Sequence, residues 1–142
     1  GLGGSVAYRY SPRPGTVFLN ITNRCSNSCS FCVRNSRPGL SGYRLWLDRE
    51  PTHDEIWAAF QHEVKSSDRE VVWCGFGEPT IRLDTVLDLT KRIRQAYPNL
   101  KVRLDTDGLA RLRNTGRNVA KELSEAGILC FNKPQCRKPR QV

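Results

Sequence analysis

The chain reads Thr16-Val-Phe-Leu-Asn-Ile-Thr22 and then, after two further residues, Cys25-Ser-Asn-Ser-Cys29-Ser-Phe-Cys32. The first run is apolar and strand-like, so the three cysteines fall on the loop that follows a strand. Their spacing lets three thiolates converge on one metal centre. Because structural zinc sites usually have four protein ligands, three ligands indicate a centre with one position open for a substrate or cofactor. The alternative, a disulfide or a set of unrelated buried thiols, fits such crowded residues poorly.

Strand-like and helix-like segments alternate after this stretch. We expect a short strand or extended arm at Tyr43-Arg-Leu-Trp-Leu47, whose odd-numbered residues are apolar. The expected elements that follow are helix 53–65, strand 70–74, helix 84–96, strand 100–105, helix 117–126 and a last strand at 128–131. This alternation implies right-handed crossovers and a parallel sheet, hence an α/β fold.

Local signals predict the helix starts and the buried helix faces. Thr52 and Glu55 form a capping box for the first helix, and we expect Asp84 to cap the second. The residues expected on buried helix faces are Ile56, Trp57, Phe60 and Val64 in the first helix, Leu87, Ile93 and Ala96 in the second, and Val119, Leu123 and Ala126 in the third.

The net charge of +9 lies mostly near the C-terminal end. Residues 1–110 carry 15 Lys and Arg against 12 Asp and Glu, whereas residues 111–142 carry 8 against 2. A basic tail without interleaved aromatic residues does not favour nucleic-acid binding. Six cysteines without an apolar signal region, and no apolar run of membrane-spanning length, favour a reducing cytoplasm and no membrane role.

Two further loops at predicted strand ends carry unusual residues. In Cys74-Gly-Phe-Gly-Glu-Pro-Thr80, two glycines allow the backbone to approach a ligand closely, and Glu78 offers a carboxylate to an ammonium group. In Leu104-Asp-Thr-Asp-Gly-Leu109, short polar side chains can meet sugar hydroxyls. Each loop alone also fits an ordinary turn. Because parallel strands end at one edge of a sheet, all three loops are expected to line that edge.

The three loops together resemble those of radical S-adenosylmethionine (SAM) enzymes. The cysteine motif of that family has the spacing of Cys25, Cys29 and Cys32, with an aromatic residue at the position of Phe31. The resemblance implies that the thiolates hold three irons of a [4Fe-4S] cluster. It also implies that the fourth iron chelates the amino and carboxylate groups of SAM.

The other two loops resemble SAM-contacting elements of the same family. Phe76-Gly77-Glu78-Pro79 aligns with its Gly-Gly-Glu-Pro element, with Phe76 in place of the first glycine, and that element contacts the SAM amino group. The third loop is similar to its Thr-Asn-Gly element, with Asp107 where asparagine is usual. The cofactor-binding residues implied by the resemblance are Phe31, Gly75, Phe76, Gly77, Glu78, Pro79, Thr106 and Asp107. No catalytic residue is assigned.

A narrower resemblance is to the TatD-linked radical SAM proteins. It rests on Leu19-Asn-Ile-Thr-Asn-Arg-Cys25, the Leu45-Trp-Leu47 arm and Gly75-Phe-Gly-Glu-Pro-Thr80. The resemblance implies an enzyme that cleaves SAM reductively to a 5′-deoxyadenosyl radical, which abstracts hydrogen from a substrate that the sequence does not identify. It also implies an electron donor of the flavodoxin or ferredoxin type and a TatD-family partner.

The resemblance implies the N-terminal half of a partial (β/α)6 TIM-like barrel with parallel strands. We expect residues 1–15 to be an irregular lead-in, residues 16–130 to be a partial radical SAM core, and residues 131–142 to be a basic, disordered tail. The missing second half suggests a truncated product, from a reading-frame change near Leu129, in which Cys130 and Cys136 are incidental. A half-sheet of this kind leaves an unpaired edge.

Two other function classes stay open. One is a cluster-binding remnant that takes up iron and sulfide without cleaving SAM. The other is a zinc or nucleic-acid module in which Cys74 supplies the fourth ligand. His53 and His62 fall on the first helix and are expected to be solvated. The Lys91, Arg92 and Arg94 group is expected on the exposed face of the second helix.

Overall fold

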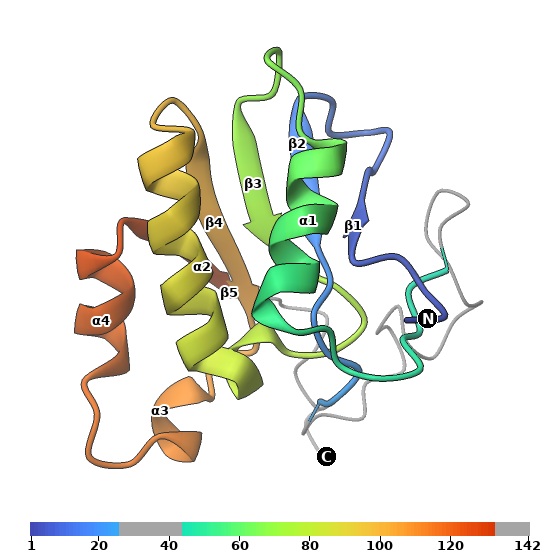
Figure 1. Ribbon diagram of the computed structural model, residues 1–142. Coiled ribbons are helices and arrows are strands. Elements are labelled where there is room, and N and C mark those ends of the chain that lie inside the picture. Colours follow the sequence, from blue (N-terminus) through green and yellow to red (C-terminus); the bar gives the residue numbers. More distant parts are fainter. Residues whose placement is uncertain (26–43, 133–142) are drawn as a thin grey trace.

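The computed structural model describes residues 1–25 and 44–132 (Figure 1). Five strands form one sheet in the order β1-β2-β3-β4-β5. Their bounds are β1 Ala7–Tyr8, β2 Thr16–Leu19, β3 Glu70–Trp73, β4 Lys101–Thr106 and β5 Ile128–Asn132. β1 is antiparallel to β2, and the other neighbouring pairs are parallel. The predicted α/β fold is confirmed, with a sheet that is mostly parallel. The described strands form an open sheet and no closed barrel.

The three longest helices lie over one face of this sheet, and the shortest lies beyond the carboxyl end of β4 (Figure 1). Their bounds are α1 His53–Glu63, α2 Leu83–Ala96, α3 Ala110–Arg113 and α4 Val119–Glu125, with a 3-10 helix, η2, at Pro79–Arg82. The main core fills the space between the sheet and α1, α2 and α4. A smaller apolar cluster on the opposite face contains Tyr8, Phe18, Leu45, Val72 and Phe76. Strand residues alternate between the two clusters, as a pleated strand requires.

Helix α1 forms as its sequence predicts at the N-terminal end. Thr52 and Glu55 make both hydrogen bonds of the capping box, and Ile56 and Phe60 are buried. The helix ends at Glu63, two residues earlier than predicted, because Val64 has extended backbone angles.

Helix α2 begins differently from the prediction that Asp84 caps it. Asp84 lies inside the first turn, and Arg82 occupies the capping position without a side-chain hydrogen bond. The reason is η2: Pro79 starts a 3-10 turn that leads directly into α2, so the helix needs no polar cap. Ala96, predicted to be buried, is exposed, and Leu87 is half-buried. The residues buried by α2 are Leu83, Thr85, Val86, Leu89, Thr90 and Ile93.

The arm at 44–47 forms no strand, although its apolar alternation is confirmed. Leu45 and Leu47 are buried, whereas Arg44 and Trp46 are exposed. Tyr43 lies outside the described residues. The predicted helix 117–126 is shorter in the structure, at Val119–Glu125.

The segment predicted to be an irregular lead-in, residues 1–15, contributes to the sheet and to both apolar clusters. It contains β1, and Val6 and Tyr8 are buried. Arg9 then ties the segment to the α1–β3 connection. It donates to Glu63 Oε1 at 2.8 Å and to the two carboxylate oxygens of Asp68 at 2.6 and 3.0 Å.

Replacing Asp68 by asparagine is expected to lower the free energy of unfolding by about 2 kcal/mol at pH 7, because hydrogen bonds to a charged partner are lost. Burial opposes the charge, but hydrogen bonds from Arg9 and from the Lys65 amide hold the pKa of Asp68 below its ordinary value. The carboxylate therefore contributes stability above about pH 4, the unfolded pKa, and loses it as pH falls through the lower folded pKa. Urea unfolding at pH 7 and pH 3 should show the difference between variant and wild type shrinking at the lower pH.

The two histidines differ in their surroundings. His62 is exposed, as expected, whereas His53 is half-buried, with Nε2 2.9 Å from the Thr85 hydroxyl. His53 is shielded from solvent, contrary to the prediction, because the start of α1 packs beside α2. Lys91, Arg92 and Arg94 are all exposed on α2, as predicted. Within the described residues, no helix has both the length and the apolar character needed to cross a bilayer.

Candidate functional site

The predicted functional residues that the structure describes lie at or directly after the ends of three parallel strands. Segment 20–25 follows β2, segment 74–80 follows β3 and segment 107–113 follows β4. We call these three segments the carboxyl edge. Such edges carry the sites of α/β folds, because the loops there can vary without disturbing the sheet.

Glu78 joins the second and third segments. It is 1% exposed. Its Oε2 accepts hydrogen bonds from the Thr80 amide (2.8 Å), the Thr80 hydroxyl (2.5 Å) and the Thr106 hydroxyl (3.1 Å). Its Oε1 accepts from the Asp107 amide at 2.6 Å. In this structure the carboxylate therefore bonds protein groups, and it also caps η2 through the Thr80 amide.

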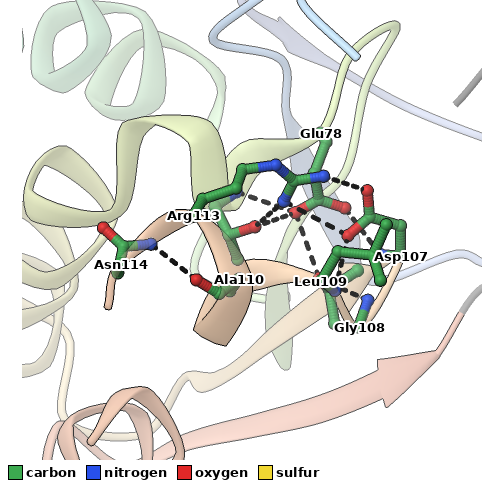
Figure 2. Close-up of polar contacts among 9 residues, drawn as sticks. Glu78, Asp107, Gly108, Leu109, Ala110, Arg113 and Asn114 are labelled. Carbon is green, nitrogen blue, oxygen red and sulfur yellow. Dashed lines mark hydrogen bonds and ion pairs between the residues drawn. The ribbon is translucent and has the colours of Figure 1, made fainter. Parts of the chain in front are cut away.

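Asp107 and Arg113 form an ion pair beside Glu78, with Arg113 reaching back from α3 (Figure 2). Arg113 Nη2 lies 2.5 Å from Asp107 Oδ2, and Nη1 donates to the Thr80 hydroxyl at 3.2 Å. The Asp107 side chain is only 3% exposed. It also accepts from the Leu109 amide at 2.9 Å, which shapes the turn into α3. Glu78, Asp107 and Arg113 together carry one net negative charge.

Asn20 joins the first segment to the second. It is fully buried, and its Oδ1 accepts from the Phe76 amide at 3.0 Å. Its Nδ2 donates to the carbonyls of Ser5 (2.9 Å) and Leu45 (2.7 Å). One amide side chain thus fixes β2, the arm and the Gly75–Thr80 loop relative to one another.

Two glycines let the second segment lie against the first. A Cβ atom at Gly75 would lie 2.2 Å from Asn20 Oδ1, and one at Gly77 would lie 2.4 Å from the Arg24 carbonyl and 2.5 Å from the Thr22 carbonyl. The Glu78 amide also donates to the Arg24 carbonyl at 2.8 Å. The sequence predicts that these glycines allow a close approach to a ligand, whereas the close approach present in this structure is to the protein's own first segment.

Of the predicted metal ligands, Cys25 is described and is half-buried. Cys29, Cys32 and the neighbouring Phe31 lie outside the described residues. Within residues 1–25 and 44–132, no three His, Cys, Asp or Glu side chains are grouped as metal ligands. Cys25 follows Arg24, whose carbonyl lies against Gly77 and the Glu78 amide. The start of the cysteine motif therefore lies beside these two residues.

Cys74 lies with the smaller apolar cluster. The Tyr8 hydroxyl donates to the Cys74 carbonyl at 2.7 Å, and burial together with Cys74 raises the pKa of Tyr8 well above its ordinary value. Nearby, Trp46 meets Phe76 edge to face, with ring centroids 5.8 Å apart. Phe76 is therefore an apolar anchor of the second segment.

Sequence reasoning missed Asn20, Thr80 and Arg113. A signal existed for Asn20, since it is a polar residue inside an otherwise apolar run, and such residues are buried only when hydrogen-bonded. Arg113 gave no comparable signal, because α3 has only four residues and no periodicity to detect.

Comparisons of the sequence with known proteins identify related proteins. The model of the radical SAM superfamily matches residues 19–132. The chain is 25% identical over 134 residues to cyclic dehypoxanthine futalosine synthase of Halalkalibacterium halodurans, covering 87% of this chain and 35% of that protein. It is 24% identical over 92 residues to dual-specificity RNA methyltransferase RlmN of Halorhodospira halophila, covering 65% of this chain and 24% of that protein. The chain spans between a quarter and about a third of the length of these relatives.

The family match contains all three segments of the carboxyl edge. It also contains Asn20, Gly77 and Glu78, the residues through which the three segments contact one another. From a match over most of its length, we conclude that this chain belongs to the radical SAM superfamily.

Proposed function

We propose that the chain is a radical SAM enzyme core in which Cys25, Cys29 and Cys32 hold a [4Fe-4S] cluster and the carboxyl edge binds SAM. The supporting observation is the hydrogen bond from the Glu78 amide to the carbonyl of Arg24, the residue before Cys25. It brings the first cysteine next to the loop that resembles the SAM-contacting element. When bound, the cluster and SAM supply reductive cleavage of SAM to methionine and a 5′-deoxyadenosyl radical, which abstracts hydrogen from the substrate.

The residues of the edge fit these groups in chemistry and charge. Three thiolates suit an iron-sulfur cluster and leave one iron for another ligand. SAM carries a sulfonium, an ammonium and a carboxylate, so its net charge is positive. Glu78, Asp107 and Arg113 have the opposite net charge and are largely shielded from water, where opposite charges attract more strongly.

We assign these residues different roles toward SAM. The backbone of Gly75, Phe76, Gly77 and Pro79 would contact SAM, together with Phe31 from the cysteine motif. Glu78 would act through the loop that it fixes, because its carboxylate already accepts four hydrogen bonds. Thr106 and Asp107 would hold the third segment against that loop.

The partners follow from the same proposal. Reductive cleavage needs an electron, so we propose a donor of the flavodoxin or ferredoxin type. The narrower resemblance supports a TatD-family partner. The six cysteines, taken as reduced thiols, support a cytoplasmic protein. The names of the two relatives indicate different reactions, the synthesis of cyclic dehypoxanthine futalosine and the methylation of RNA, so neither reaction is assigned to this chain.

The test is anaerobic reconstitution with iron and sulfide, followed by SAM and a chemical reductant, with 5′-deoxyadenosine as the measured product. We expect product from the wild-type protein and none from Cys25→Ala. Cys130→Ala is the matched control, because Cys130 is exposed on β5 and outside the motif. It is expected to keep wild-type activity.

Two results would contradict the proposal. A cluster that forms without yielding 5′-deoxyadenosine indicates a cofactor-binding protein without the radical reaction. A colourless protein that takes up zinc in place of iron, with Cys74 required, indicates the zinc module instead.

A further inference from the structure

Two stretches of chain, one before the cysteine motif and one after it, are hydrogen-bonded to each other. The stretch before the motif contains Thr22, Asn23 and Arg24, and the stretch after it contains Leu47 and Glu50. We call the contacts among these five residues the loop-base clamp. All five belong to the described part of the chain.

The first layer of the clamp pairs Asn23 with the backbone of Leu47. Asn23 Nδ2 donates to the Leu47 carbonyl at 2.6 Å, and Asn23 Oδ1 accepts from the Leu47 amide at 3.0 Å. The two residues are 24 positions apart. An asparagine amide has one donor face and one acceptor face, so it satisfies both backbone groups of Leu47 as a neighbouring strand would.

The second layer is built on Glu50. Its Oε2 accepts from the Thr22 hydroxyl at 2.5 Å and from Arg24 Nε at 2.6 Å, and its Oε1 accepts from Arg24 Nη2 at 3.0 Å. Arg82 of η2 adds a second cation, with Nε 3.8 Å from Oε1. An exposed ion pair alone contributes little, but a bidentate pair inside a wider network fixes geometry.

The clamp holds Arg24 on one side, and the Glu78 loop holds it on the other. The Arg24 side chain bonds Glu50, whereas its carbonyl accepts from the Glu78 amide at 2.8 Å. Arg24 precedes Cys25 directly. Fixing both the side chain and the carbonyl of Arg24 therefore restricts where the Cys25 backbone can lie before any cofactor binds.

We propose that Asn23 and Glu50 are positioning residues that hold Cys25 in a ligating position, an inference that rests on the proposed function. Preorganised ligands bind with less loss of conformational entropy, so the clamp should govern retention of the cluster. Neither residue needs to touch the cluster or SAM.

The first experiment measures Cys25 alone, in the cluster-free protein. Full-length wild type, Asn23→Ala and Glu50→Gln are treated with iodoacetamide, and Cys25 alkylation is followed by peptide mass spectrometry relative to Cys74 in the same molecule. We expect Cys25 to react at least fivefold faster in both variants. Glu50→Asp, which keeps the charge, should restore most of the slow rate. Glu122→Gln is the matched control, because Glu122 of α4 forms a similar bidentate pair with Arg117.

The second experiment uses the reconstituted proteins and measures iron release to bathophenanthroline and the electron paramagnetic resonance spectrum of the reduced cluster. Release at least tenfold faster in Asn23→Ala and Glu50→Gln, with an altered spectrum, supports the inference. Alkylation and release rates within twofold of wild type in both variants overturn it. A wild type that takes up no iron contradicts the proposed function, and the alkylation rates then decide the inference about Cys25 by themselves.

Discussion

Glu78→Gln is expected to lower the free energy of unfolding by about 3 kcal/mol, because hydrogen bonds to a buried charged acceptor are lost and a buried donor is left unsatisfied. The physical reason is that glutamine has one acceptor oxygen where Glu78 has two. Whichever way the amide turns, its NH2 group faces a donor: the Asp107 amide at Oε1, or Thr80 and Thr106 at Oε2.

Urea unfolding of the cluster-free protein measures this effect. Glu122→Gln is again the control, since the Glu122 carboxylate is about one-third exposed and its loss should cost less than about 1 kcal/mol. A free energy of unfolding for Glu78→Gln within about 1 kcal/mol of wild type would show that the carboxylate is not the joint between the second and third segments. In that case Glu78 would be available to bond a ligand directly.

Gly77→Ala is expected to separate the first two segments of the carboxyl edge. The new Cβ atom would lie 2.4 and 2.5 Å from two carbonyl oxygens of the backbone, and backbone cannot move aside as a flexible side chain does. We expect a loss of about 3 kcal/mol in the free energy of unfolding, at the upper end for overpacking. The segment that carries Cys25 would be displaced, so cluster uptake and SAM cleavage should be lost as well.

Gly116→Ala is the control for this substitution. Gly116 has a φ of +85°, and a Cβ atom added there would meet nothing within 4 Å, so alanine costs only backbone strain of about 1 kcal/mol. Its cluster content should equal that of the wild type. Retention of the cluster by Gly77→Ala would refute the close approach of the two segments.

The elements with strong local signals were predictable from the sequence. The capping box of α1 and the apolar runs of β3 and β4 are read over a few neighbouring residues, and each is present. The start of α2 was not predictable in detail, because a 3-10 turn at Pro79 replaced the expected cap at Asp84. β1 was missed because it has two residues, too few for a pattern, and depends on pairing with β2.

The candidate site also has parts that could be predicted from the sequence and parts that could not. The second and third loops could be picked out because glycine, proline and acidic residues follow apolar runs. The ties between them could not, because they join residues far apart in sequence, such as Asn20 with Phe76 and Glu78 with Asp107. No local rule says that the Arg113 guanidinium will return to Asp107.

These hydrogen bonds join residues that are far apart in the chain, and this separation affects whether the protein folds before or after it receives iron. Asn20 and the Phe76 amide are 56 positions apart, and the pairing of β2 with β3 brings them together. Small zinc domains acquire their structure as the metal binds. Here the scaffold around Cys25 is made by hydrogen bonds and apolar packing instead, so folding should come first and iron delivery second. Under the proposed function, the polypeptide that receives the cluster would therefore already be folded.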